Sequence, residues 1–264
     1  MVGWIVPPPK APSKTARDYA RERERKTLGL ESRGLLKSPR IKSALLKVPR
    51  EEFIPRDYRD YAYWEVPLPL PGSSATISCP HSYPLFYEPL GLDRGHHFLE
   101  VGTGSGYGAA LAREIVGNEG VVVSIEIDAL TYEFAKRNLE RAGYSDVLLV
   151  LGDGGLGYPT AAPYDRIAVT AACPRIPAPL IEQLTTGGRA IAPLREGDRQ
   201  VLTLVTKQPG GMRRETICDV LYVALRGEYG IEASATGFWP DNAIGADRAQ
   251  ESRTKCSCRG PARR

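Results

Sequence analysis

Cysteine, methionine and histidine are scarce in this chain of 264 residues, which has 5 Cys, 2 Met and 3 His. Cys79, Cys173 and Cys218 are widely spaced, and the set does not suggest a disulfide framework. Cys256 and Cys258 have one residue between them, whereas the CxxC pairs of zinc and redox sites have two. We therefore expect reduced cysteines, no metal site and a cytoplasmic protein.

Long apolar runs are also missing. No stretch approaches the roughly 20 apolar residues that a membrane-spanning helix needs. The first ten residues, MVGWIVPPPK, lack the basic region and long apolar segment of a secretory signal. Hydrophobic residues make up 42% of the chain and charged residues 25%, which is ordinary for a globular protein. We expect no membrane partner.

The net charge of +4 raises the question of a nucleic-acid partner. Residues 1–30 carry seven Lys or Arg and three Asp or Glu, which gives a net charge of +4. Residues 247–264 carry six Lys or Arg and two Asp or Glu, which also gives +4. The intervening body therefore has a net charge of −4, so a basic groove across the fold is not expected. Both basic ends predict solvated segments, and the mixed signs of Arg17–Lys26 predict an exposed helix with ion pairs.

Short apolar runs alternate with helical stretches from residue 97 onwards. We predict helices over 107–116, 129–142 and 179–184, and strands over 97–101, 120–125, 147–151, 166–170, 189–193, 200–207 and 219–225. Continuously apolar strands separated by helices indicate the α/β class with a doubly wound, mostly parallel sheet. Gly210 and Gly211 predict a turn, so we expect a C-terminal antiparallel hairpin to close the sheet.

Four regions are expected along the chain. Residues 1–14 contain four prolines and predict a flexible arm. Residues 15–90 predict an N-terminal helical and capping segment, with a break at Pro39. Residues 91–233 hold the α/β pattern, and residues 234–264 form an extension whose role the sequence does not indicate.

A glycine-rich loop follows the first predicted strand, where residues 99–107 have the sequence LEVGTGSGY. Glycines let a backbone turn tightly and approach a ligand closely. The next strand ends near Glu126, about 20 residues further on, where a carboxylate can accept both hydroxyls of a ribose. The strand, loop, helix and acid together predict a nucleotide-containing ligand.

Two ligand classes fit this loop. Gly104, Gly106 and Ala109 satisfy the dinucleotide pattern G-x-G-x-x-G/A. Glu100 lies two residues before Gly102, where a carboxylate repels a pyrophosphate but attracts a ligand carrying ammonium and sulfonium groups. The order acid-x-G-x-G-x-G resembles the first motif of class I S-adenosylmethionine-dependent methyltransferases. That resemblance implies their Rossmann-like fold and S-adenosyl-L-methionine as the cofactor.

The same resemblance implies a role for each part of the loop region. It places Glu100 near the methionine part of the cofactor and Glu126 at the ribose hydroxyls, with Asp153 and Gly154 beside the adenine. The implied cofactor-binding residues are Glu100, Gly102, Thr103, Gly104, Ser105, Gly106, Glu126, Asp153 and Gly154.

Further segments, in this order, resemble the protein-L-isoaspartate O-methyltransferase family over roughly residues 34–230. They have the sequences VPREEFIP (48–55), AY (62–63), PLPL (67–70), TISCPH (76–81), GDG (152–154), APYD (162–165) and GGR (187–189). Thr-Ile-Ser-x-Pro is the family's own mark. The resemblance implies methyl transfer to the free α-carboxylate of L-isoaspartyl residues in damaged proteins, which starts repair through a succinimide.

The resemblance also places the active-site serine at Ser78. A late segment, YVAL (222–225), resembles the family's substrate-side Phe-Val-Pro-Leu. The implied substrate-binding residues are Thr76, Ile77, Pro80, His81, Val223 and Leu225. The expected partners are isoaspartyl-containing peptides and proteins, without nucleic acid, and the protein is expected to be a monomer.

The sequence departs from the family pattern around the expected peptide site. The segment GSSA (72–75) stands where Gly-x-Gly-Gln is usual, and Glu65 stands where an aspartate is usual. Pro84 and Pro89 are expected to interrupt the helix after His81. One alternative is therefore a catalytically weak relative that binds isoaspartyl chains.

A second alternative is a tRNA adenine methyltransferase on the same fold, which would use the basic ends of the chain. Against it, residues 170–173 after the fourth predicted strand have the sequence TAAC. An Asn/Asp-Pro-Pro-Tyr-like motif would stand there in such an enzyme.

Overall fold

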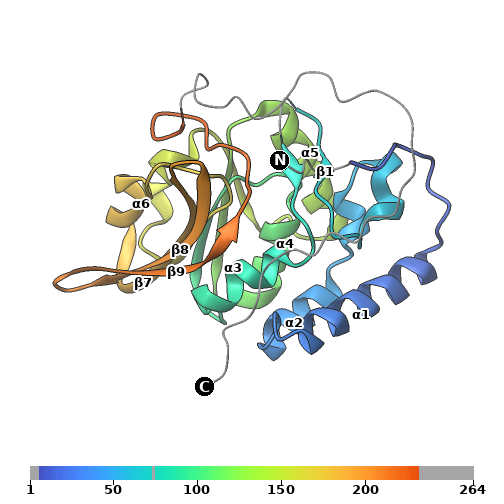
Figure 1. The fold of residues 1–264 in the computed structure, drawn as a ribbon, viewed down its shortest axis with the longest axis horizontal. Coiled ribbons are helices and arrows are strands. Elements are labelled where there is room, and N and C mark those ends of the chain that lie inside the picture. The colour runs from blue at the N-terminus through green and yellow to red at the C-terminus, as the bar shows by residue number, and fades with distance from the viewer. Residues whose placement is uncertain (1–5, 73–74, 232–264) are drawn as a thin grey trace.

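A seven-stranded sheet forms the centre of the molecule (Figure 1). The computed structural model describes residues 6–72 and 75–231. Within them the strand order is β5-β4-β3-β6-β7-β8-β9. The strands are β3 (His97–Val101), β4 (Val121–Glu126), β5 (Leu148–Leu151), β6 (Tyr164–Val169), β7 (Leu184–Glu196), β8 (Arg199–Gln208) and β9 (Gly211–Val220).

The strands β3 to β7 pair in parallel, and β8 and β9 add to the sheet in antiparallel fashion. The helices between them are α4 (Tyr107–Val116), α5 (Ala129–Ala142) and α6 (Ala178–Glu182). The expected doubly wound, mostly parallel α/β sheet with a C-terminal hairpin is therefore confirmed. Neighbouring carboxyl ends of β3, β4 and β6 meet at one edge, where ligands bind in such sheets.

The strand predicted over 219–225 was placed too late. The observed strand β9 begins at Gly211 and ends at Val220, and residues 221–225 continue as an irregular segment. The first residues of β9 are exposed and include Arg213 and Arg214, so no apolar run marks them. As an edge strand, β9 gains its order from pairing with β8 and needs no buried face there.

Two clusters of buried side chains pack on opposite faces of the sheet. Phe98 and Val122 join a cluster that includes residues from α1 to α5, whereas Leu99 and Val123 join a second cluster with Leu180 of α6. Successive residues of a strand point to opposite faces, which explains the division. Both faces of the central strands are buried, as their continuous apolar runs predict.

The N-terminal region forms helices that pack beside the sheet. They are α1 (Ala16–Ser32), α2 (Pro39–Lys47) and the 3-10 helices η1 (Arg50–Phe53) and η2 (Arg56–Tyr61). Thr15 caps α1 by a reciprocal bond with Asp18, and Ser38 caps α2 with Pro39 as its first residue. Figure 1 shows α1 and α2 side by side, far from the β8–β9 hairpin.

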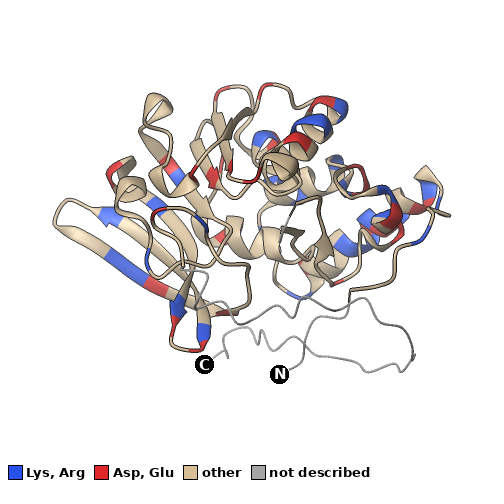
Figure 2. Ribbon diagram, turned by 90° about the horizontal axis from the view of Figure 1, so that it is seen from above, with Lys and Arg blue, Asp and Glu red and all other residues tan. Residues whose placement is uncertain are grey.

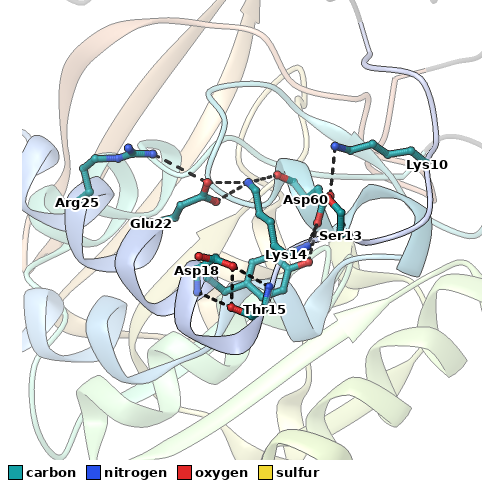
Figure 3. A network of polar contacts seen from close by, with 9 residues as sticks. Lys10, Ser13, Lys14, Thr15, Asp18, Glu22, Arg25 and Asp60 are labelled. Carbon is teal, nitrogen blue, oxygen red and sulfur yellow. Dashed lines mark hydrogen bonds and ion pairs between the residues drawn. The ribbon is translucent and has the colours of Figure 1, made fainter.

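Residues 6–14, which belong to the arm expected over 1–14, lie along η2, where Lys10 N–H donates to the Asp57 carbonyl. The buried carboxylate of Asp60 accepts hydrogen bonds from the Ser13 backbone N–H and hydroxyl at 3.0 and 2.7 Å (Figure 3). It also accepts a bond from Tyr19 Oη at 2.9 Å and pairs with Lys10 Nζ at 3.2 Å. One buried acid thus fastens the arm.

Helix α3 (Ser82–Leu90) runs through both prolines, so the expected interruption is wrong. Pro84 is the third residue of the helix, where a backbone N–H has no helical acceptor. Pro89 is the second-last residue, so little helix follows it. Gly91, at φ +60°, then closes α3 through a bond from its N–H to the Glu88 carbonyl.

Acidic and basic residues are interleaved along α1 and on the β8–β9 hairpin (Figure 2). Lys14 Nζ lies 2.6 Å from Glu22, and Lys26 Nζ lies 3.0 Å from Glu65. The ion-paired helix expected at the N-terminus is confirmed by Arg25 Nη2, which lies 3.9 Å from Glu22 within α1. Lys14 and Glu65 lie outside this helix.

The helices within the described residues include none long and apolar enough to cross a membrane. The tail thiols Cys256 and Cys258 and the extension over 234–264 lie outside the described residues.

Candidate functional site

A cavity of about 390 Å³ opens at the carboxyl ends of β3, β4 and β6. Its walls come from the glycine loop after β3, the end of β4, the β2 segment that follows residue 75, and residues 219–226, which include the last two residues of β9. Ser78, Glu100 and Glu126 all line it. The structure therefore brings the expected active-site serine and both expected cofactor carboxylates to one cavity.

The glycine loop forms the floor of the cavity. Gly102 and Gly104 adopt φ +93° and +57°, conformations that favour glycine. The nearest atoms to a side chain built on Gly104 would be Leu70 Cδ1 at 3.5 Å and the Thr76 carbonyl at 3.8 Å. The loop therefore faces β1 (Leu68–Pro69) and β2 (Thr76–Ile77), which pair in antiparallel fashion and carry the Thr-Ile-Ser segment.

Glu126 ends β4 and is held by backbone donors. Its Oε2 accepts a bond from Gly104 N–H at 2.9 Å, and its Oε1 accepts from Ile127 and Asp128 N–H at 3.0 and 3.1 Å. Burial raises the pKa of this carboxyl, and the three N–H donors oppose the rise. The loop and the acid thus fix each other, and Glu126 lies where a ribose diol can reach it.

Glu100 lies deeper, at 3% exposure near the end of β3. Its Oε2 accepts a hydrogen bond from Ser124 Oγ at 2.7 Å, and Ser124 in turn lies 2.7 Å from Thr103 Oγ1. Burial raises the pKa of Glu100 to about 8. The hydrogen bond from Ser124 lowers this pKa, and the negative charge of Glu126 raises it further. A cationic ligand in the cavity would favour the ionised carboxylate.

Ser78 directly follows β2, and Arg50 hydrogen-bonds to its backbone carbonyl. Arg50 is only 1% exposed, and its Nη2 donates to the Ser78 carbonyl at 2.7 Å while its Nε donates to the Ala62 carbonyl at 2.6 Å. Its guanidinium also lies over the rings of Tyr83 and Tyr107, 5.6 and 5.2 Å from their centroids. This buried cation fixes the backbone that presents Ser78.

Tyr222 also contacts Ser78, and the family resemblance assigned it no role. Burial raises the pKa of its phenol, and hydrogen bonds with Ser82 and Ser78 oppose the rise. The residue lines the cavity. The family's segment has Phe where this chain has Tyr222. The extra hydroxyl was the sign in the sequence that this residue could bond Ser78.

Most of the expected site residues line the cavity. They are Thr76, Ile77, Ser78, His81, Glu100, Gly102, Thr103, Gly104, Ser105, Glu126, Gly154, Val223 and Leu225. Three expected residues do not line it: Pro80, Gly106 and Asp153.

Each of the three has a structural position that explains its absence from the wall. Pro80 is buried. Gly106 precedes α4 at φ +86°. Asp153 turns its carboxylate to the backbone N–H groups of Gly155 and Glu228, each at 2.8 Å. Asp153 therefore ties the 225–230 segment to the end of β5.

The donor set fits S-adenosylmethionine better than a dinucleotide. A buried carboxylate next to the loop attracts ammonium and sulfonium groups, and it would repel a pyrophosphate. A Cβ on Gly108 would come 2.1 Å from Glu100 Oε1, so the first turn of α4 can pack against this acid only with glycine there. The residues present are therefore suited to the cofactor that the motif implies.

Comparison with known proteins agrees with the resemblance. Residues 23–230 match the protein-L-isoaspartate(D-aspartate) O-methyltransferase family. The protein-L-isoaspartate O-methyltransferase of Methanopyrus kandleri is 44% identical over 216 residues, which cover 81% of this chain and 95% of that protein. Protein-L-isoaspartate O-methyltransferase 1 of Archaeoglobus fulgidus is 45% identical over 193 residues, covering 73% and 88%.

Solved structures give the same result. A protein-L-isoaspartate O-methyltransferase superposes with a TM-score of 0.73 at 36% identity, covering 79% of this chain and 67% of that one. A Plasmodium falciparum protein described as a putative protein-L-isoaspartate O-methyltransferase, in complex with S-adenosyl-L-homocysteine, shares the fold with a TM-score of 0.69 at 23% identity. It covers 77% of this chain and 98% of that one. The chain belongs to the protein-L-isoaspartate(D-aspartate) O-methyltransferase family.

Proposed function

We propose that this protein methylates the free α-carboxylate of L-isoaspartyl residues in damaged proteins, with S-adenosyl-L-methionine as the methyl donor. The observation that carries the proposal is the single cavity that joins Ser78 to Glu100 and Glu126. The family-marking segment forms one wall of this cavity, and the glycine loop forms its floor. A methyl donor on the loop and an acceptor at Ser78 would therefore meet inside one cavity.

The proposed chemistry needs no general base. The substrate carboxylate is ionised at neutral pH, so its oxygen can attack a methyl carbon directly. S-adenosylmethionine, when bound, supplies an electrophilic sulfonium methyl, and the carbon–sulfur bond breaks with its electron pair on sulfur. The protein's residues supply position and exclude water.

Ser78 is proposed to hold the substrate carboxylate through its hydroxyl. Arg50 fixes the Ser78 carbonyl, so the hydroxyl is presented from an anchored backbone. Thr76, Ile77 and His81 on the same segment, and Val223 and Leu225 opposite, are proposed to contact the peptide. The methyl ester then closes to a succinimide away from the enzyme and reopens partly as normal aspartate.

The protein is further proposed to act as a cytoplasmic monomer without nucleic acid. The tRNA adenine methyltransferase reading is not favoured, because residues 170–173 hold no catalytic Asn/Asp-Pro-Pro-Tyr-like motif. Instead, Ala172 and Cys173 form bridges with Ala224 and Leu194 in the sheet. Binding of bulk tRNA, measured on filters at two salt concentrations, separates the two readings.

The chemical nature of the product tests the proposed function. The protein is incubated with S-adenosylmethionine carrying a labelled methyl group and a peptide with one isoaspartyl residue. A carboxyl methyl ester releases its label as methanol in mild base, whereas a methylated amine or adenine keeps it. Base-labile label on the peptide is expected. Cofactor binding without any transfer would instead support the catalytically weak relative.

A further inference from the structure

Three metal-binding side chains converge beside Ser78. Glu65, Cys79 and His81 offer a carboxylate oxygen, a thiol sulfur and a ring nitrogen that all lie within 4.8 Å of one another. His81 Nδ1 is 2.7 Å from Glu65 Oε2. This combination of oxygen, sulfur and nitrogen donors is typical of zinc and its neighbours in the transition series.

The cluster is built by the local fold. Leu68 pairs with Ile77 in the β1–β2 ribbon, so continuing this antiparallel register places Glu65 opposite the segment that holds Cys79 and His81. Cys79 and His81 flank one intervening residue, and both line the main cavity. An ion could therefore reach these donors from the cavity.

The ion pairs of Glu65 leave one of its oxygens for the cluster. Lys26 Nζ and Arg33 Nη2 approach its Oε1 at 3.0 and 3.7 Å, whereas Oε2 faces His81. One oxygen thus points into the cluster. The two cations weaken the attraction for a metal, so a micromolar rather than nanomolar Kd is expected.

We propose that Glu65, Cys79 and His81 form a binding site for a thiophilic divalent cation such as Zn²⁺, and that the bound ion inhibits methyl transfer. The Cys79 thiol loses its proton to solvent as its sulfur binds the metal. Water or another small ligand completes the tetrahedron. This site differs from the sequence-based expectation of no metal, because Glu65 is distant from the two other donors in sequence.

The position of the ligands explains the inhibition. Tetrahedral zinc brings its donor atoms to about 3.3–3.6 Å from one another. His81 Nδ1 lies 2.7 Å from Glu65 Oε2, and the three donor atoms lie within 4.8 Å of one another, so coordination changes these spacings. The change is proposed to shift the segment of Cys79, which directly follows Ser78. A displacement of about 1 Å at a reacting centre can cost about 100-fold in rate. This half of the proposal rests on the proposed function, whereas metal binding does not.

Cobalt absorption tests the site without any enzyme assay. Co²⁺ is titrated into the full chain carrying Cys256→Ser and Cys258→Ser, which removes the tail thiols. One equivalent is expected to give a thiolate-to-cobalt charge-transfer band and tetrahedral d–d bands. Adding Cys79→Ala or, independently, His81→Asn should abolish them and weaken Zn²⁺ binding in calorimetry by more than about 100-fold, since even outer-shell changes cost about 10–100-fold.

Cys218→Ala is the matched control, because this thiol lies on β9 outside the cluster. Its bands and its Zn²⁺ affinity should equal those of the parent, and thermal melts verify that all variants fold. Bands that persist in the Cys79→Ala protein, or bands that never form in the parent, would overturn the site.

Inhibition is measured separately. Zn²⁺ should slow methyl transfer by the parent at least about tenfold relative to the metal-free parent. The Cys79→Ala protein should transfer methyl groups at the same rate with and without Zn²⁺. Cobalt bands without inhibition would overturn the inhibitory role alone. If no methyl transfer occurs under any condition, the proposed function fails, and the cobalt result still decides the site.

Discussion

Two carboxylates of the same type have different surroundings in this cavity. Glu126 accepts three backbone hydrogen bonds, whereas Glu100 has one hydroxyl donor and almost no exposure. Burial therefore raises the pKa of Glu100 to about 8. At neutral pH the carboxyl of Glu100 is therefore mostly protonated before a cation binds. Cofactor binding should then expel a proton.

Cofactor affinity should consequently depend on pH. The Glu100 pKa in the folded protein lies above its ordinary value of 4.5, so the proton is retained up to about pH 8. Calorimetry should show S-adenosylmethionine binding that strengthens by up to about tenfold per pH unit from pH 6 to 8 and then levels. Glu100→Gln should bind more weakly at pH 8 and lose this dependence.

Glu100→Gln also tests how the protonation of Glu100 is coupled to folding, through the dependence of thermal stability on pH. In the cofactor-free protein, the buried Glu100 proton favours folding below pH 4.5, and that advantage is lost as pH rises through about 8. Glu100→Gln should therefore melt at a higher temperature than the parent at pH 8 and similarly at pH 5. An unchanged pH dependence of both affinity and melting would contradict this account of Glu100.

Ser78→Ala should lower kcat by about 10- to 100-fold, the cost of losing one hydrogen bond to a charged group. The Kd for S-adenosylmethionine should stay within about twofold, because the loop and its acids are untouched. Ser82→Ala is the matched control, since this hydroxyl also bonds Tyr222. An equal loss of kcat in the control would assign the effect to Tyr222 instead.

At the level of elements, the sequence predicts best where a segment is buried on both faces. The bounds predicted for β3, α4 and α5 agree with the structure, because their apolar patterns or caps are complete. β9 could not be placed from its exposed, charged first half. The convergence of Glu65 with Cys79 also escapes prediction, since it depends on the pairing of β1 with β2.

The N-terminal arm shows how one distant contact changes a prediction. Its prolines are typical of flexible chain, but Asp60, at 2% exposure, binds Ser13, Tyr19 and Lys10 across more than 40 positions (Figure 3). The sequence of residues 6–14 does not indicate that Asp60 will bind them. Deletion of residues 1–14 should therefore lower stability, contrary to what the arm's composition alone suggests.

Asp60→Ala should lower the free energy of unfolding by about 2–3 kcal/mol, because it leaves the buried Tyr19 hydroxyl and the Ser13 donors without their acceptor. Urea denaturation measures the change. Asp57→Ala, an exposed acid on the same 3-10 helix η2, should change stability by less than about 0.5 kcal/mol. Equal effects of the two substitutions would show that Asp60 does not fasten the arm.

At the scale of the whole molecule, the basic charge is separate from the site. Within the described residues, Lys14, Arg23 and Lys26 of the N-terminal run pair with acids. The basic residues after 246 lie outside the described residues. The cavity instead presents two buried acids and a polar serine segment, as expected for a cationic donor and an anionic acceptor.

The most direct test of the central claim compares two peptides that differ at one residue, isoaspartyl in one and aspartyl in the other. The shift of one methylene moves the carboxylate relative to Ser78, and such misplacement costs about 100-fold in rate. We predict that kcat/KM for methyl transfer favours the isoaspartyl peptide by at least that factor. Equal rates for the two peptides, or no transfer to the isoaspartyl form, would contradict the account.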